Sequence, residues 1–215
     1  MKKLASESIG NILRTILLAL IILESIVFII TIIFVIDYNS YLPFAQIEQA
    51  INTFIFISLF IMYLIYVIWI YKVHVDMQQL NLNYPISPVK SVLSFVIPFY
   101  NLYGAWNVHS KLADSFRQRN LPKAIRLGDT IMKVLPVAYL LTFADRVLGM
   151  YLNDLLEAQE VVSEYLWLSV EVVFLALLLS YWRLYKSITE GVRFISAPGM
   201  NESEDESEST GTEGV

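Results

Sequence analysis

The chain of 215 residues contains no cysteine, and charged residues make up only 16% of it. The absence of cysteine excludes disulfide bonds, cysteine-ligated zinc, iron–sulfur clusters and thiol nucleophiles, and it leaves the redox compartment undetermined. An ordinary soluble domain carries about 25% charged residues. With so few charges, a soluble fold could not cover the apolar surface that the other residues supply.

What the chain has instead is apolar and aromatic side chains. Hydrophobic residues make up 56% of the sequence, with 13 Tyr, 12 Phe and 4 Trp, and the mean hydropathy is +0.57. Soluble domains have about 45–50% apolar residues, and such an aromatic content is typical of membrane interfaces. We therefore expect an integral membrane protein rather than a large buried helical core.

Motifs of known chemistry are also missing. The sequence has no H-E-x-x-H pattern, Gly-rich phosphate loop, G-x-S-x-G elbow or convincing Ser–Lys pair. His74 with Asp76, or His109 with Asp114, could hold a metal only if the chain folds them together, and we expect solvated histidines near the membrane interface instead. The sequence predicts no cofactor, no metal site and no enzyme activity.

Four apolar runs are long enough to cross a bilayer, which takes about 20 helical residues. They cover residues 11–36, 51–71, 130–152 and 161–185. The first follows a basic start (residues 1–10) but exceeds the core of a signal peptide, so we expect a retained signal anchor. The third is the least apolar, because it contains Pro136, Asp145 and Arg146.

Lys and Arg residues predict the orientation of these runs. They occur before the first run, throughout the connection 72–129 and after the fourth run, whereas residues 37–50 have none. Because Lys and Arg favour the cytoplasmic side, both termini are predicted to be cytoplasmic in a multi-pass protein of the cell membrane. The tail 199–215 is expected to be disordered, because residues 201–215 hold six acids and no large apolar residue except Val215.

The stretch "SFVIPFYNLYGAWNV", residues 94–108, is apolar but too short for a fifth crossing. A crossing here would also move the Lys and Arg residues of 109–126 outside. We expect a helix over Ser87–Val96, a break at Pro98–Asn101 and a second helix over Leu102–Arg119. The predicted fold class is an all-α membrane protein with four transmembrane helices and a cytoplasmic-side re-entrant or interfacial helical segment over 87–119.

Two stretches, "WIYKVHVDM" and "SPVKSVLSFVIPFYNLYGAWNV", carry a resemblance. Over residues 65–120 the chain resembles bacterial membrane proteins of domain-of-unknown-function family 4328, which have a Trp-x-x-Arg-x-x-x-Asn element closing the second helix. A later Trp-Phe-(Ile/Val)-Pro-x-x-Asn-Leu segment follows in the family, and this chain has Ser94 in place of its Trp. The resemblance implies a four-helix protein of a bacterial inner membrane and brings no activity. The matching positions are Trp69, Lys72 (for Arg), Asp76 (for Asn), Phe95, Pro98, Asn101 and Leu102.

Charged side chains inside the runs are candidates for function, because each costs about 2.5–3.5 kcal/mol at the centre of a membrane helix. Arg146 is expected to pair with Glu171 or Glu164 and fix helix packing. The alternative is a polar pathway or proton relay that uses Glu24, Asp145 and Glu171. Glu24 has no base at its level, and a neutral acid bonded to a nearby hydroxyl is its simpler interpretation.

The basic stretch 109–126 is expected to contact anionic lipid headgroups rather than nucleic acid. Leu112, Ala113 and Phe116 would form the embedded side of an interfacial helix. Besides the lipid bilayer, a protein partner or a second copy of the chain is the expected partner.

Three classes of function stay open. The first is a non-catalytic accessory, assembly or regulatory component that acts through helix and loop contacts. The second is a small transporter or channel with a polar site at Glu24 and the break at Pro98–Asn101. The third is a membrane-embedded enzyme acting on lipid, which the lack of a catalytic set disfavours.

Overall fold

The computed structural model describes residues 4–80, 84–97 and 100–197, with the backbone alone for 100–102. No strand occurs among these residues, which form helices and short connections. The helices are α1 (Glu7–Ile36), α2 (Tyr38–Tyr41), the 3-10 helix η1 (Leu42–Phe44), α3 (Ala45–Leu80), α4 (Pro88–Val96), α5 (Tyr100–Arg117), α6 (Pro122–Glu157) and α7 (Glu164–Ile195).

Three helical stretches are long and apolar enough to cross a membrane. They are α1, the run from α2 to the end of α3, and α7. Large apolar side chains on them face outward; Ile22, Phe56 and Phe60 are 60%, 76% and 65% exposed. Because a surface of this kind is stable against lipid rather than water, these helices indicate a membrane-spanning protein.

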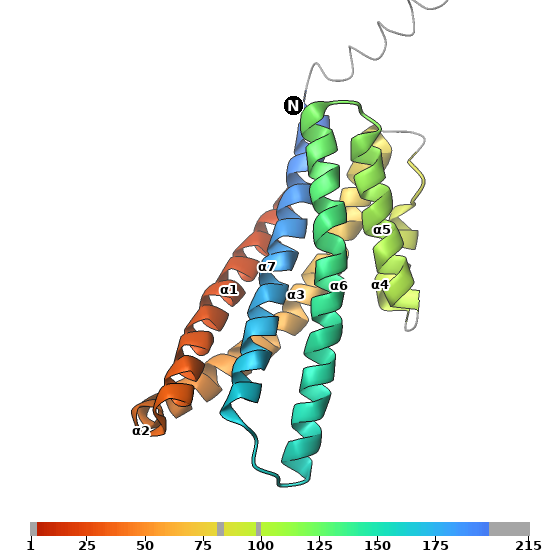
Figure 1. The fold of residues 1–215 in the computed structure, drawn as a ribbon. Coiled ribbons are helices and arrows are strands. Elements are labelled where there is room, and N and C mark those ends of the chain that lie inside the picture. The colour runs from red at the N-terminus through yellow and green to blue at the C-terminus, as the bar shows by residue number, and fades with distance from the viewer. Residues whose placement is uncertain (1–3, 81–83, 98–99, 198–215) are drawn as a thin grey trace, which may run out of the picture.

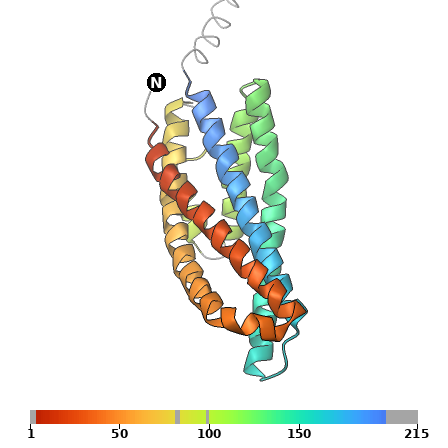
Figure 2. The ribbon, with the colours of Figure 1, turned by 90° about the vertical axis from the view of Figure 1, so that its left-hand side faces the viewer.

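The long helices and the α4–α5 hairpin form a closed ring in which each element packs on the next (Figures 1 and 2). The order around the ring is α3, α1, α7, α6, α5 and α4, and α4 packs on α3 again. We call the end where α1 begins and α7 ends the terminal end, and the opposite end the loop end. The α4–α5 hairpin lies beside α3 and α6 in the terminal half (Figure 1).

Two clusters of buried apolar residues hold the ring together. The larger one occupies the terminal half, where Trp69, Phe116 and Ile188 are almost completely buried. The smaller one joins α1, α3 and α7 nearer the loop end and consists of Leu20, Val27, Ile55 and Leu178.

The apolar face of α5 is covered by protein. Leu112, Ala113 and Phe116 are each 0% exposed, and the Phe116 ring lies against Gly191 of α7. The expectation that these three residues face lipid is therefore wrong. Helical periodicity identifies an apolar face, but it does not say whether lipid or another helix covers it.

Local sequence signals set the start of the hairpin. The hydroxyl of Ser87 accepts a hydrogen bond from the Lys90 N–H at 3.3 Å, and Pro88 occupies the first turn of α4. Both are ordinary signals for a helix start, because they satisfy or remove unpaired N–H groups. Pro98, expected at the break, and the acidic tail 199–215 lie outside the described residues.

Candidate functional site

The start of α1 is fixed by a carboxylate that lies some seventy positions away in the sequence. Asp76, near the end of α3, accepts hydrogen bonds from the Ala5 N–H at 2.8 Å and the Ser6 N–H at 2.9 Å, and it is 2% exposed. Ser6 is the N-cap residue of α1 but makes no capping bond with its own side chain. Asp76 therefore ties the entry of α1 to α3.

Trp69 fixes α1 from the same helix. Its indole ring is 1% exposed and lies against Gly10 and the ring of Tyr185, whose centroid is 5.3 Å away. The Tyr185 hydroxyl donates to the Gly10 carbonyl at 2.8 Å. Lys72, which stands at the Arg position of the element Trp-x-x-Arg-x-x-x-Asn, is half-buried, with its ammonium 6.0 Å from the ring centroid of Tyr71. Trp69 and Asp76 thus both act on the first turns of α1.

A cluster of three rings joins α3, α4 and α5. The Phe95 ring packs on Tyr66 and His109 at centroid distances of 5.5 and 5.8 Å. His109 Nδ1 lies 2.7 Å from the Ala105 carbonyl oxygen, and Nε2 lies 2.6 Å from the Tyr66 hydroxyl. A carbonyl only accepts, so Nδ1 carries the proton and Tyr66 donates to Nε2. Burial lowers the pKa of His109, in agreement with this neutral ring.

His74 is buried in the same way. Its Nδ1 lies 2.8 Å from the Ile70 carbonyl oxygen and its ring packs on Tyr84, while its Nε2 is buried and has no hydrogen-bond partner in the described part of the chain. The expectation of solvated histidines is wrong for both residues, because neighbouring helices and the 84–87 connection cover them. Throughout the described ranges, no three His, Asp or Glu side chains lie together in a way that could hold a metal.

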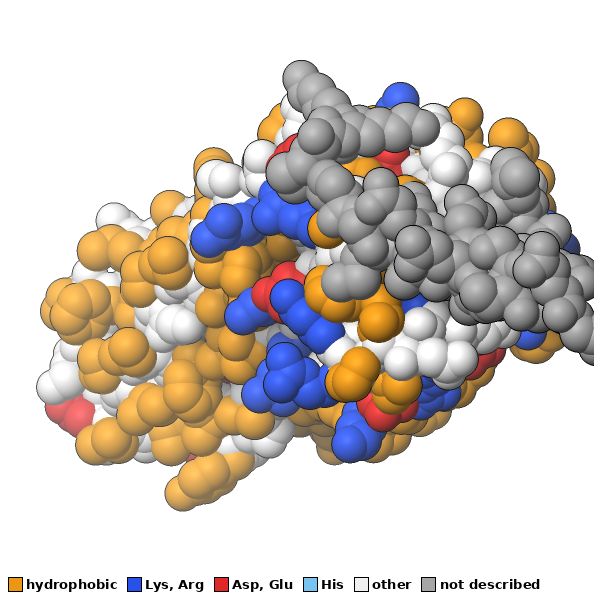
Figure 3. Space-filling view, turned by 90° about the horizontal axis from the view of Figure 1, so that it is seen from above, with side chains coloured by type: hydrophobic (Ala, Val, Ile, Leu, Met, Phe, Trp, Pro, Cys, Tyr) orange, Lys and Arg blue, Asp and Glu red, His pale blue; other side chains and the backbone are white. Residues whose placement is uncertain are grey.

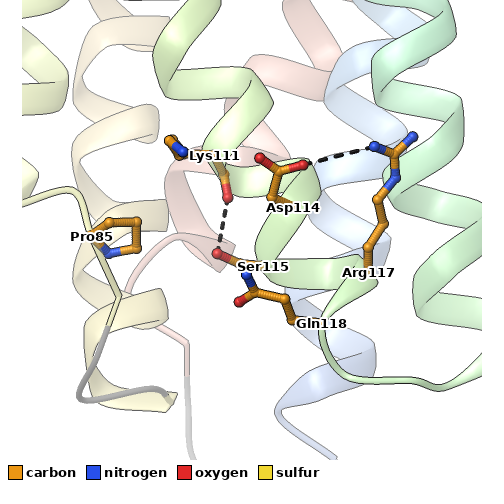
Figure 4. A pocket seen from close by; sticks show the side chains of 6 residues that line it. All are labelled: Pro85, Lys111, Asp114, Ser115, Arg117 and Gln118. Carbon is orange, nitrogen blue, oxygen red and sulfur yellow. Dashed lines mark hydrogen bonds and ion pairs between the residues drawn. The ribbon is translucent and has the colours of Figure 1, made fainter.

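A surface pocket of about 450 Å³ lies between the connection before α4 and the end of α5 (Figure 4). Arg117 in its wall is bound by two carboxylates, Asp129 at 2.7 Å and Asp114 at 3.7 Å. The charge of Arg117 is therefore already compensated, and Lys111 is the other cation of the pocket. Its remaining lining residues are Pro85, Ser115 and Gln118.

Two acidic side chains meet in the loop half of the bundle. Glu24 of α1 is 1% exposed, and its carboxyl group shares a hydrogen bond with Glu171 of α7. The expected pairing of Arg146 with Glu171 or Glu164 is not formed among the described residues; Arg146 is exposed on α6, and Asp145 beside it is half-buried. Counting residues from the centre of each helix predicted that Arg146 and Glu171 lie at the same depth in the membrane. It did not predict in which direction each side chain points.

The sequence did not indicate several residues that join helices, including Tyr66, Tyr185 and Gly10. In the sequence they stand out only as a tyrosine or a glycine within an apolar helix. Tyrosines at a membrane interface look the same in the sequence, so this signal does not identify residues that join helices. Asn101 and Leu102 belong to α5, and their side chains lie outside the described part.

Comparison of the chain with protein-family models, curated proteins and solved structures finds no match. The likeness to family 4328 therefore stays a prediction.

Proposed function

We propose that the protein is a non-catalytic accessory, assembly or regulatory component of a membrane that acts through helix and loop contacts. One observation supports this proposal most strongly: several polar side chains of the terminal half are used to join helices. Asp76 binds the start of α1, Tyr185 binds Gly10, and Tyr66 binds His109. Groups committed to such bonds are poorly suited to bind a substrate.

In this proposal α6 is a fourth crossing. It has 36 residues, the same number as α3, although Asp145 and Arg146 make it more polar. Four apolar side chains along its loop half point outward, as expected for a helix in contact with lipid: Leu140, Phe143, Val147 and Met150 are between 46% and 68% exposed. A helix with this apolar outer face would then tolerate Asp145 and Arg146 in the membrane.

The α4–α5 hairpin is proposed to enter the inner leaflet and return. α4 turns Ser91, Ser94 and Phe95 toward the protein, while its exposed side chains other than Lys90 are apolar. Val89, Leu93, Val96 and Ile97 are between 43% and 60% exposed. A helix with polar residues inside and apolar residues outside suits a lipid environment.

The terminal end is proposed to face the cytoplasm. Lys and Arg side chains gather there, beside a flank covered by apolar side chains (Figure 3). Lys111, Lys123 and Arg126 are exposed near this end and would contact anionic headgroups. The compensated Arg117 would contribute little.

The absence of cysteine allows a direct test of this topology. Asn39→Cys, Glu160→Cys and Gln118→Cys each place one thiol at an exposed position of a chain that has no other. With a membrane-impermeant maleimide on intact cells, we expect labelling at positions 39 and 160 but not at 118, which should react only after permeabilisation. Labelling of Gln118→Cys in intact cells would contradict the orientation and the non-crossing hairpin.

The contact function is tested by photocrosslinking in native membranes. A photoreactive amino acid would replace Phe60 on α3, Leu93 on α4 or Phe143 on α6, which are 65%, 46% and 67% exposed. We expect a discrete protein adduct from one of these faces and lipid adducts from the others. If all three positions give lipid adducts alone, the proposed function is wrong.

A further inference from the structure

Glu24 is an acidic side chain in apolar surroundings. It lies one helical turn from Leu20 and from Val27 on α1, which are 1% and 0% exposed and belong to the smaller apolar cluster. Leu178 and Phe174 extend this cluster on α7. Among the described residues, the Oε1 atom of Glu24 is buried and has no hydrogen-bond partner. A charge is very costly in such a place unless it is paired.

Within the described ranges, the hydrogen-bond partner of this carboxyl group is another acid. Glu24 and Glu171 share a side-chain hydrogen bond between α1 and α7, which pack along each other. Two ionised carboxylates carry acceptors and no donor, so this bond requires a proton on one of them. Carboxyl pairs at such short range do not ionise together, as the aspartic protease dyad illustrates.

The neighbouring charges do not compensate the pair. The groups that act on it electrostatically from the other packed helices are Asp145 of α6, which affects Glu24, and Glu48 of α3, which affects Glu171. Arg146 is exposed on α6 and acts on the adjacent Asp145. The surroundings of the pair are therefore negative or apolar, and both conditions favour a retained proton over an ion pair.

We propose that Glu24 and Glu171 form a proton-binding site within the membrane. Glu24 is fully buried and Glu171 is partly exposed, so Glu171 is the member through which the proton exchanges with the surroundings. Loss of the proton leaves two adjacent negative charges on α1 and α7. Their repulsion loosens the contact between these helices, so the site links protonation to helix packing in the loop half.

The test is infrared spectroscopy of the full-length protein in lipid vesicles at neutral pH, which detects the C=O stretch of a protonated carboxyl group and its shift in D2O. We expect the wild type to show this band, Glu24→Gln to lose it, and Glu171→Gln to lose or shift it. Glu164→Gln, an exposed residue at the start of the same helix, is the matched control and should keep the band unchanged.

Two results would overturn the proposal. One is a wild-type spectrum without a protonated carboxyl band at neutral pH, a measurement that needs no variant. The other is a band that stays unchanged in both Glu24→Gln and Glu171→Gln, which would place the proton on a different side chain such as Asp145. In each variant the Gln amide can hydrogen-bond to the remaining carboxyl group. Both variants should therefore fold, which circular dichroism would show.

Discussion

Replacing Asp76 with alanine is expected to lower the free energy of unfolding by about 2–4 kcal/mol, because two backbone N–H groups lose a charged acceptor. The carboxylate binds the N–H groups of Ala5 and Ser6 and is 2% exposed. Hydrogen bonds to charged groups contribute about 1.5–3 kcal/mol each. Ala5 is exposed, so water replaces part of the loss there, whereas Ser6 is buried.

The measurement is unfolding of the purified protein in detergent micelles, with two variants for comparison. Asp76→Asn keeps an oxygen acceptor without the charge and should lose less than Asp76→Ala. Asp114→Ala removes a side chain that is 44% exposed and 3.7 Å from Arg117, so it should cost at most about 1 kcal/mol. Equal losses for Asp76→Ala and Asp114→Ala would show that Asp76 does not anchor α1.

Replacing Gly128 with alanine is expected to destabilise the packing of α5 on α6, although alanine is the better helix former. A Cβ atom at this position would lie 2.6 Å from the backbone oxygen of Ala113 and 3.0 Å from Cγ of Arg117. The near atom belongs to the backbone of Ala113, a buried residue of α5, so the two helices must move apart. Overpacking of this kind costs about 1–3 kcal/mol, and the gain in helix propensity returns only about 1 kcal/mol.

Gly149, also in α6, provides the matched control. A Cβ atom there would meet nothing within 4 Å. Gly149→Ala should therefore leave the free energy of unfolding unchanged or raise it by up to about 1 kcal/mol. We expect Gly128→Ala to melt at a lower temperature than the wild type in the same detergent. If both substitutions stabilise the protein equally, the close approach of α5 to α6 is not maintained in solution.

The sequence predicted the helices well where one physical signal dominates. Long apolar runs gave α1, α3 and α7, because only a helix satisfies its own backbone over some twenty lipid-facing residues. The predicted helix over Ser87–Val96 corresponds to α4, which begins at Pro88 with Ser87 as its N-cap. The predicted break over Pro98–Asn101 is too long, because α5 begins at Tyr100 and Asn101 is helical, while residues 98–99 lie outside the described part.

The candidate site was harder to predict from the sequence. The sequence singled out Glu24, Asp145, Arg146 and Glu171 as intramembrane charges, and the structure brings Glu24 and Glu171 together. It does not pair Arg146 with either expected glutamate among the described residues. Counting residues along a helix gives the height of a side chain, whereas the rotation of each helix about its axis depends on all its neighbours.

The sequence by itself determined that the chain is helical, apolar enough for a membrane and without thiol chemistry, because composition and run length decide these properties locally. Only the tertiary structure decided that Asp76 binds the start of α1, that Phe116 is covered by α7, and that Glu24 meets Glu171. Each of these contacts joins segments far apart in the chain. No local pattern encodes them, since they depend on how the helices pack against one another.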